Sequence, residues 1–215
     1  MNPELLADLP LPQRLALSYA PAGAHEVNLA LLALDARLGA VLRGRREPIA
    51  AQMRLAWWRE RLAQAPASWP LGEPVLEALR AWRDPSALAV LAEGWEVLLA
   101  ERLTLDVAAE FIDARGRACA SLARELGTSE EHAAAGAGRV WAAADLAAHV
   151  SDEGEHAMTV AHGRSLPPPG RLPRALRPLA VLAALGQRAL RRGGEPLLDG
   201  PRATLLALRT GLSGR

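Results

Sequence analysis

Lysine is absent from this chain and cysteine occurs once, and each scarcity excludes a class of chemistry. All 25 basic residues of the 215-residue sequence are arginine. A chain without lysine has neither a Schiff-base lysine nor the lysine of a P-loop. Because Cys119 is the only cysteine, intrachain disulfides and cysteine-rich zinc sites are excluded as well. A single thiol is consistent with a reducing compartment.

Long apolar runs and a strong net charge are also lacking. The best candidate for a membrane-spanning segment, 27–42, is interrupted by Asp35 and Arg37, whereas a spanning helix needs roughly 18 or more apolar residues. The first residues carry acids and prolines instead of the basic start and apolar run of a signal peptide. The net charge of +1 argues against a nucleic-acid partner. We therefore expect a cytoplasmic protein with at most peripheral membrane contact.

Alanine and leucine dominate the apolar half of the sequence, and both are strong helix formers. Proline and glycine separate segments whose apolar residues recur at helical spacing. Short connections between such segments favour antiparallel packing of neighbouring helices. We therefore expect one all-α domain over 1–215, an antiparallel helical bundle with little or no sheet. The expected helices are 9–17, 22–43, 47–65, 71–82, 86–103, 104–126, 129–149, 156–164, 172–192 and 202–210.

Several helix ends carry capping signals. Serine, threonine and aspartate are typical N-caps, and glycine is typical just after a helix. The segment 151–154 either interrupts the helix before it or caps a new one. The other expected caps are Asp84 before Pro85, Thr104, Ser129 and, at a C-terminus, Gly127.

Two adjacent tryptophans mark the most distinctive segment, 47–62, which reads EPIAAQMRLAWWRERL. The whole chain has six tryptophans, one tyrosine and one phenylalanine, so a tryptophan pair within a helix is a strong feature. Adjacent helical residues point about 100° apart. We therefore expect one of Trp57 and Trp58 to pack in the core and the other on a flanking helix or a cavity rim.

Arginines are concentrated around this segment. The sequence RGRR at 43–46 predicts the end of the preceding helix, because basic residues and glycine suit a helix C-terminus. The cluster is either a solvated face paired with Glu47 and Glu60 or a site for an anion or a partner protein. Its members are Arg43, Arg45, Arg46, Arg54, Arg59 and Arg61.

A fixed order of segments extends over about residues 14–192. It runs LSYAP (17–21), LALLALDARLGAVL (29–42), the tryptophan segment, GRACASLARELG (116–127), GRVWAAADLAAHVSDEGE (138–155) and RLPRALRPLAVLAAL (171–185). This order resembles the squalene/phytoene synthase family, whose members join two prenyl diphosphates. The resemblance implies an isoprenoid synthase fold.

The resemblance also implies two aspartate-rich motifs on facing helices. Their carboxylates hold the Mg²⁺ ions that neutralise a departing diphosphate. At the first motif this chain has Gly39, Ala40 and Arg43 where aspartates are expected, and Asp35 lies one turn earlier. These residues are not suited to hold Mg²⁺.

The second motif is partly kept. Asp145 falls where the family often has asparagine, and His149 falls where its first essential aspartate is expected. Asp152 and Glu153 lie near the second acid. Helical spacing would let these residues share a face and bind a cation weakly; the alternative is a polar face toward solvent.

The loss of carboxylates beside a kept structural signature indicates a catalytically degenerate member of the family. Such a protein would act as an accessory, assembly or isoprenoid-binding protein, with a protein partner or an isoprenoid ligand and no cofactor. The alternative is an active Mg²⁺-dependent prenyltransferase of the squalene or phytoene synthase type. In that case Asp35, Asp145, Asp152 and Glu153 would hold the metal.

Eight residues are the candidates for contact with a ligand or a diphosphate. Ser18 matches a position that contacts diphosphate in active members of the family, although capping of a helix end is the commoner use of such a serine. An arginine can bind phosphate in bidentate fashion. The candidates are Ser18, Tyr19, Asp35, Arg43, Arg54, Trp58, Asp145 and His149.

The histidines and the cysteine raise a separate possibility of metal or thiol chemistry. His149 and His156 would face the same way only in a continuous helix, and no HExxH pattern is present. Surface or capping roles are therefore expected for these residues and for His162. Cys119 lies in a helix rich in alanine and leucine, where it is expected to act as a small buried apolar residue.

Overall fold

Helices form the regular structure of the described chain, residues 3–43 and 48–214, in this computed structural model. Of the described residues, 76% are helical and none lies in a strand. The all-α prediction is thus confirmed. The α-helices are α1 Pro3–Asp8, α2 Leu11–Leu17, α3 Ala22–Arg43, α4 Pro48–Ala63, α5 Pro74–Leu79, α6 Ala89–Val97, α7 Leu105–Glu125, α8 Glu131–His149, α9 Glu153–Ser165, α10 Arg177–Arg191 and α11 Gly200–Ser213. Short 3-10 turns are η1 Pro66–Ser68, η2 Pro85–Leu88 and η3 Arg174–Leu176.

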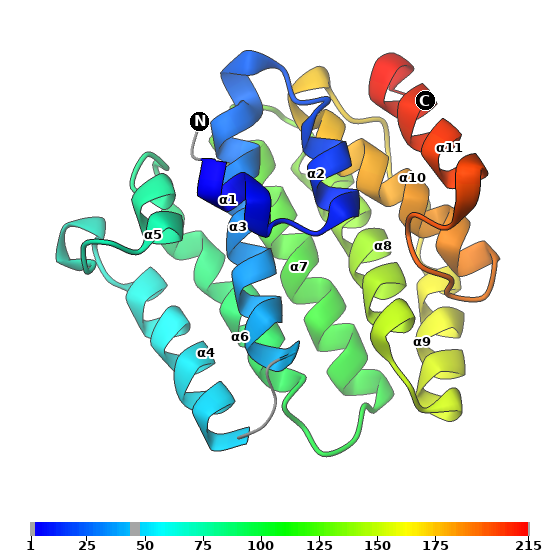
Figure 1. The fold of residues 1–215 in the computed structure, drawn as a ribbon, viewed down its shortest axis with the longest axis horizontal. Helices are drawn as coiled ribbons and strands as arrows, with labels where there is room; N and C mark the ends of the chain where they lie inside the picture. Colours follow the sequence, from blue (N-terminus) through cyan, green and yellow to red (C-terminus); the bar gives the residue numbers. More distant parts are fainter. Residues whose placement is uncertain (1–2, 44–47, 215) are drawn as a thin grey trace.

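Helices α3, α7 and α8 lie in the middle of the bundle (Figure 1). Helix α7 packs along α8 and also against α6, while α8 packs against α10. Helices α4 and α6 lie on one side, and α9, α10 and α11 lie on the other (Figure 1). The successive helices α7, α8 and α9 alternate in direction, as short connections favour.

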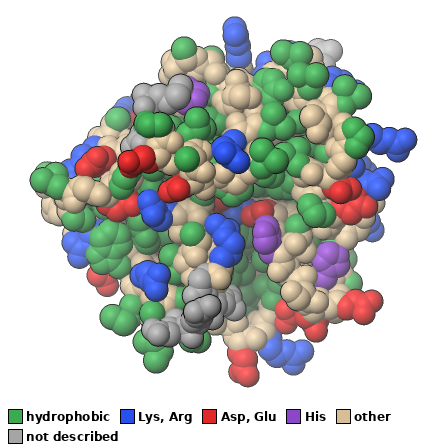
Figure 2. Space-filling view, viewed as in Figure 1, with side chains coloured by type: hydrophobic (Ala, Val, Ile, Leu, Met, Phe, Trp, Pro, Cys, Tyr) green, Lys and Arg blue, Asp and Glu red, His purple; other side chains and the backbone are tan. Residues whose placement is uncertain are grey.

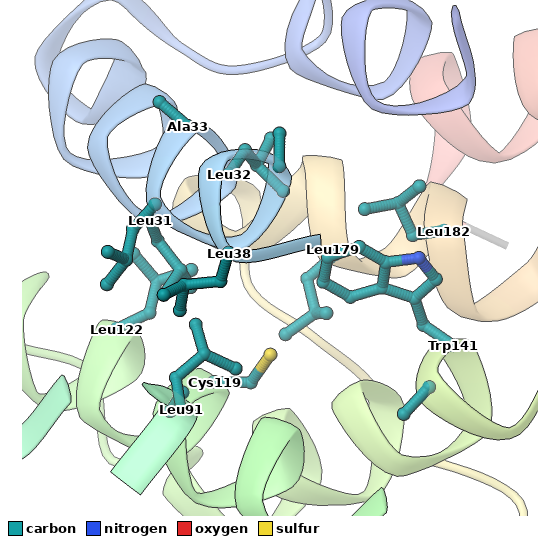
Figure 3. Close-up of a cluster of buried hydrophobic side chains, with 14 of the residues drawn as sticks. Leu31, Leu32, Ala33, Leu38, Leu91, Cys119, Leu122, Trp141, Leu179 and Leu182 are labelled. Atoms are coloured by element: carbon teal, nitrogen blue, oxygen red, sulfur yellow. The ribbon is translucent and has the colours of Figure 1, made fainter. Parts of the chain in front are cut away.

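One continuous hydrophobic cluster extends from α1 to α11. Figure 3 shows its centre, where Leu38 of α3, Leu91 of α6, Cys119 of α7, Trp141 of α8 and Leu179 of α10 lie close together. Burial of these apolar side chains is the main force that holds the helices together. Among the described helices, none is long and apolar enough to cross a membrane.

Small residues allow the two central helices to approach closely. A Cβ atom added at Gly138 of α8 would lie 2.7 Å from the Sγ atom of Cys119 on α7. A Cβ atom at Gly116 of α7 would lie 3.0 Å from the carbonyl oxygen of Ala135 on α8. The α7–α8 contact therefore depends on glycine on both helices.

Three of the expected caps are present. Thr104 Oγ1 accepts a hydrogen bond of 3.3 Å from the Val107 amide at the start of α7, and Gly127 after α7 has a φ of +67°. Asp152 Oδ1 accepts a hydrogen bond of 2.9 Å from the Glu155 amide. Asp152 therefore caps the new helix α9, which decides between the two alternatives for 151–154.

Two expected caps are wrong. Helix α8 begins after Glu130 without a side-chain cap, because Ser129 Oγ donates to the Glu130 carboxylate instead. Asp84 makes no cap bond either; its carboxylate accepts a hydrogen bond of 2.6 Å from Ser86. In both places the side chain that was expected to cap the helix forms a hydrogen bond with a neighbouring side chain instead.

Some predicted helix bounds also differ from the structure. The segment 9–17 is helix only from Leu11, and α1 precedes it, because Pro10 stands at the N-cap position of α2. The segment 86–103 divides into η2 and α6, and the chain leaves the helix after Val97. The Leu103 amide then donates to Glu155 Oε1 at 3.0 Å, a tertiary bond in place of a helical one.

The tryptophan pair is arranged as expected. Trp58 is buried and Trp57 is half-buried. Their rings meet edge to face, with centroids 5.1 Å apart and an interplanar angle of 86°. The guanidinium of Arg61 lies 6.0 Å from the centre of the Trp57 ring.

Candidate functional site

A charged cluster of Arg115, Asp35 and Asp145 lies inside the bundle. Arg115 Nε donates a hydrogen bond of 3.1 Å to Asp35 Oδ1, and Arg115 Nη1 donates one of 2.9 Å to Asp145 Oδ2. The side chains of Arg115 and Asp35 are 1% and 2% exposed, and that of Asp145 is 22% exposed. Since the three residues belong to α7, α3 and α8, one guanidinium bridges carboxylates from two other helices.

Both oxygens of the buried Asp35 carboxylate accept hydrogen bonds. Its Oδ1 atom accepts a second hydrogen bond of 3.0 Å from the indole nitrogen of Trp95. Its Oδ2 atom accepts a hydrogen bond of 3.4 Å from the side-chain amide of Gln13 on α2. A buried charge is tolerated when it is paired and hydrogen-bonded in this way.

Three aromatic rings enclose the guanidinium of Arg115. Its central carbon lies 4.4 Å from the ring centre of Trp141, 4.7 Å from that of Phe111 and 5.1 Å from that of Trp95. Such rings attract a cation through their negative faces, most strongly when water is excluded. The third nitrogen, Nη2, has no hydrogen-bond partner among the described residues. The rings therefore stabilise the guanidinium charge where a hydrogen bond to Nη2 is lacking.

The electrostatics keep Arg115 charged. Burial by itself would lower the pKa of Arg115, but the negative charges of Asp35 and Asp145 outweigh it and the pKa is raised. Burial raises the pKa of Asp35, and attraction to Arg115 opposes that rise without cancelling it. A permanent cation therefore stands between the two carboxylates.

A cavity of about 410 Å³ adjoins this cluster at the end of the bundle where α3 and α8 terminate. Asp145 of the cluster lines the cavity, as do Trp95 and Phe111, two of the rings around Arg115. Figure 2 shows a hollow on this face of the molecule, with charged and histidine side chains around it. The volume falls in the range of roughly 300–1,000 Å³ that is usual for small-molecule sites.

The wall of the cavity is largely apolar, and a few polar groups lie among its lining. His149 is exposed, and its Nδ1 atom lies 2.7 Å from the carbonyl oxygen of Asp145, one turn earlier on α8. The polar or charged side chains in the lining are Arg43, Glu101, Arg102, Asp145, His149, Ser151 and Glu155. An apolar body with a polar end would fit this arrangement.

Four of the eight candidates from the sequence lie at the cavity or at the charged cluster beside it. Arg43, Asp145 and His149 line the cavity, and Asp35 lies behind it in the cluster. Gly39, at a position where the family resemblance leads one to expect an aspartate, also lines the cavity. The structure therefore brings Gly39 and Arg43 of α3 to the same cavity as Asp145 and His149 of α8, whereas Ala40 is exposed and does not line it.

The other four candidates lie elsewhere. Ser18 Oγ donates a hydrogen bond of 2.7 Å to the Leu15 carbonyl, the helix-end role that was the alternative for this residue. The Tyr19 ring packs against Gly211 of α11. Arg54 is exposed on α4, and Trp58 is buried in the hydrophobic core without lining the cavity.

Of the two alternatives for Asp145, His149 and Asp152 or Glu153, the shared helix face is wrong. Helix α8 ends at His149, and Asp152 begins the separate helix α9, so helical spacing does not continue between them. The described residues contain no group of three or more histidine, cysteine, aspartate or glutamate side chains arranged to hold a metal ion. The exposed Asp152 instead serves as a cap.

The remaining histidine and cysteine predictions can be placed in the structure. His156 Nδ1 lies 2.9 Å from the Ala147 carbonyl and Nε2 lies 2.8 Å from the Gly193 carbonyl, so this ring joins three parts of the chain. Cys119 is buried, as expected, and burial raises the pKa of its thiol to about 12. The thiol is therefore protonated at neutral pH and unsuited to act as a nucleophile.

Two arginines of the basic cluster around the tryptophan segment have side-chain partners within the described part of the chain. Arg59 forms an ion pair of 3.5 Å with Glu96 of α6, not with Glu60 of its own helix. Arg61 donates a hydrogen bond of 3.0 Å to Gln64. Arg45, Arg46 and Glu47 lie outside the described residues, as does the glycine of the predicted helix end at 43–46.

Arg115 was not identified from the sequence, although a signal for it exists. It lies in a run of buried α7 residues spaced three and four apart: Ala108, Phe111, Ile112, Arg115, Cys119 and Leu122. A single arginine within an apolar stripe requires a buried acid as its partner. Its partners lie 80 and 30 positions away in the sequence, so the pattern alone does not name them.

Comparison of this chain with known proteins gives no match. No family model matches the sequence, and neither a curated protein nor a solved structure matches it. The resemblance to squalene/phytoene synthases consequently depends on the ordered segments between residues 14 and 192 alone.

Proposed function

We propose that this chain is a catalytically degenerate relative of the squalene/phytoene synthases that binds an isoprenoid or a similar apolar ligand in the cavity beside Arg115. The observation that carries the proposal is the bridge that Arg115 forms between Asp35 and Asp145. An active member would use acids on facing helices to hold Mg²⁺. In this chain an arginine lies between the two acids that come nearest to that role.

The bridge disfavours metal binding for a physical reason. Mg²⁺ requires oxygen ligands in octahedral arrangement at about 2.0–2.1 Å. One oxygen of Asp35 and one of Asp145 already accept hydrogen bonds from a guanidinium that stays charged. A divalent ion between them would meet the positive charge of Arg115. Metal-assisted departure of diphosphate therefore lacks its usual ligands here.

The cavity supports a binding role. Its apolar wall includes Leu42, Trp95, Leu98, Leu103 and Leu146, with the charged and polar side chains named above also in the lining. Burial of apolar ligand surface against such a wall contributes about 25 cal/mol per Å². A ligand with an apolar chain and a polar end would be retained without being converted. This is the behaviour of an accessory or assembly protein that holds an isoprenoid.

The absence of turnover is tested directly with the purified chain. Farnesyl diphosphate and geranylgeranyl diphosphate are incubated separately with the protein and Mg²⁺, and diphosphate release is measured. We expect release at the rate of the protein-free control. Sustained turnover, with loss of that turnover in the Asp145→Asn variant, would establish the alternative of an active prenyltransferase.

Ligand binding is tested by calorimetric titration with farnesol. Val107 is half-buried on α7 and lines the cavity, so Val107→Phe should reduce the affinity about tenfold or more by filling it. The matched control is Val27→Phe on α3, which is half-buried away from the cavity and should leave the affinity unchanged. Absence of saturable binding, or equal effects of the two variants, would contradict the proposed site.

A further inference from the structure

Charge is distributed very unevenly along the chain. Residues 171–215 contain nine arginines and two acidic residues, a net charge of +7. Residues 1–170 carry a net charge of −6, with sixteen arginines and twenty-two acidic residues. The near-neutral total thus conceals a strongly basic C-terminal part, which consists mainly of α10 and α11.

Helix α11 presents an apolar stripe to solvent. It packs on the bundle through Ala203, Ala207, Thr210 and Gly211, which are buried. Leu205, Leu208 and Leu212 lie on the opposite side, at helical spacing, and are 65%, 46% and 72% exposed. Helix α11 lies at the outer edge of the molecule next to α10 (Figure 1). Figure 2 shows apolar and basic side chains together in this upper right region.

Arginines surround a groove next to this stripe. The groove between α10 and α11 has a volume of about 430 Å³, and Arg171, Arg191 and Arg209 all line it. No ion pair of these three side chains occurs within the described part of the chain. Arg209 and the exposed Arg202 lie beside the leucine stripe on the outer side of α11. The surface therefore combines exposed leucines with uncompensated positive charge.

We propose that the α10–α11 face docks on the surface of an anionic lipid bilayer. A helix with an apolar stripe beside cations is suited to lie in the plane of a membrane interface, with leucines at the acyl boundary. The arginines would contact lipid phosphates, which a guanidinium binds in bidentate fashion. This inference is independent of the proposed ligand in the cavity beside Arg115.

Charge complementarity favours a bilayer over a second copy of this chain. A symmetric dimer through α11 would bring the same stripe of each copy together and place Arg202 and Arg209 near the arginines of the other copy. Like charges facing each other weaken such a contact. An anionic membrane instead offers a complementary charge to the arginines and an apolar layer to the leucines.

The test is sedimentation of the full chain with lipid vesicles. Vesicles of phosphatidylcholine alone are compared with vesicles that also contain phosphatidylglycerol. We expect retention on the anionic vesicles, little on the neutral ones, and release as sodium chloride is raised. A comparison of sodium phosphate with sodium chloride at matched ionic strength shows whether free phosphate competes specifically for the groove.

Two variants probe the two parts of the surface. The triple variant Leu205→Ser, Leu208→Ser and Leu212→Ser removes the stripe, and the triple variant Arg171→Gln, Arg191→Gln and Arg209→Gln removes the charge. Loss of each arginine should lower vesicle partitioning about fivefold. Two double variants serve as controls and change exposed residues outside the stripe and the groove: Leu11→Ser with Leu71→Ser, and Arg14→Gln with Arg117→Gln. These controls should bind as the unmodified chain does.

Several results would overturn the proposal. Equal retention on neutral and anionic vesicles, or no retention on either, would exclude docking through charge. If phosphate releases much more protein from the vesicles than chloride does at the same ionic strength, the groove binds a soluble anion instead of the membrane. A dimer in light scattering that dissociates in the leucine variant would assign the stripe to a second copy. Circular dichroism of each variant shows whether a loss of binding reflects unfolding, and a folded variant that binds normally would also count against the proposal.

Discussion

Arg115 Nε lies 3.1 Å from Asp35 Oδ1, and neither side chain is more than 2% exposed. The two residues come from α7 and α3, and Asp145 of α8 completes the bridge. Removal of one charge from a buried pair costs more than the pair itself contributes, because the other charge is left without a partner. The folded state therefore depends on Arg115 more than on any surface arginine.

Replacement of Arg115 is expected to destabilise the fold strongly. Arg115→Met should lower the free energy of unfolding by about 3–5 kcal/mol, because the Asp35 carboxylate is then buried without a positive charge beside it. Urea denaturation measures the change. The control is Arg124→Met, which breaks the exposed 3.0 Å pair with Glu131 and should cost less than about 1 kcal/mol. Adding Asp35→Asn to Arg115→Met should recover part of the loss; similar costs for both single variants would contradict the buried bridge.

The thiol of Cys119 should be unreactive in the folded protein. Because burial raises the pKa of Cys119 to about 12 and the side chain is excluded from solvent, a thiol reagent at pH 8 should label it only after denaturation. Absorbance of the released thiolate of Ellman's reagent reports the labelling. Rapid reaction without denaturant would show that the α7–α8 contact opens readily.

The same pKa predicts a loss of stability in alkaline solution. A free thiol ionises near 9.0, so between pH 9 and pH 12 the unfolded state binds fewer protons than the folded state and the free energy of unfolding falls as pH rises. By pH 11 the loss from this group should reach about 2–3 kcal/mol. Cys119→Ala should remove that part of the slope. Since the chain has no lysine and one tyrosine, few other side chains titrate in this range; an unchanged slope would contradict the assignment.

The contact of α6 with α7 should tolerate glycine but not alanine at position 94. A Cβ atom at Gly94 would collide with the Cβ atom of Ala114, so Gly94→Ala should destabilise the fold by about 1–3 kcal/mol. Gly23→Ala on α3 is the control, because nothing lies within 4 Å of the added atom; it should be neutral or stabilise by up to about 1 kcal/mol. Thermal unfolding measures both. Ala114→Gly should rescue Gly94→Ala, and failure to do so would place the strain elsewhere.

The two adjacent tryptophans should differ in their contribution to stability. Trp58 is buried in the core, so Trp58→Ala should cost about 3–5 kcal/mol. Trp57 is half-buried, and Trp57→Ala should cost less than about 2 kcal/mol. Guanidinium denaturation of the two variants compares them. Equal costs would mean that the outer ring contributes as much apolar contact as the inner one.

Helix content and several helix ends were predictable because they depend on local chemistry. Thr104 caps α7 and Gly127 follows it with a positive φ, as the residue types suggest. The caps at Asp84 and Ser129 were wrong because each side chain bonds to a neighbour instead. The residue type indicates whether a side chain is able to form a cap hydrogen bond. Whether it forms that bond depends on the other partners within its reach.

The candidate site was predictable only in part. Asp35, Arg43, Asp145 and His149 were singled out by their place in the ordered segments, and the structure brings them to the cavity and to the charged cluster next to it. Arg115 was missed, because its partners are remote in sequence. Ser18 and Tyr19 belong to the same ordered segments, yet the packing of α2 and α11 keeps them away from the cavity.

The sequence by itself determined the helical class of this protein, the burial of its cysteine and the fact that the two tryptophans of α4 differ in burial. These follow from propensity, apolar spacing and the 100° step between neighbouring helical residues. Only the tertiary structure decided that Arg115 stands between Asp35 and Asp145, and that the leucines of α11 remain exposed beside arginines. The physical reason is that charge pairing and burial depend on which helices meet, and that is set by packing across the whole chain.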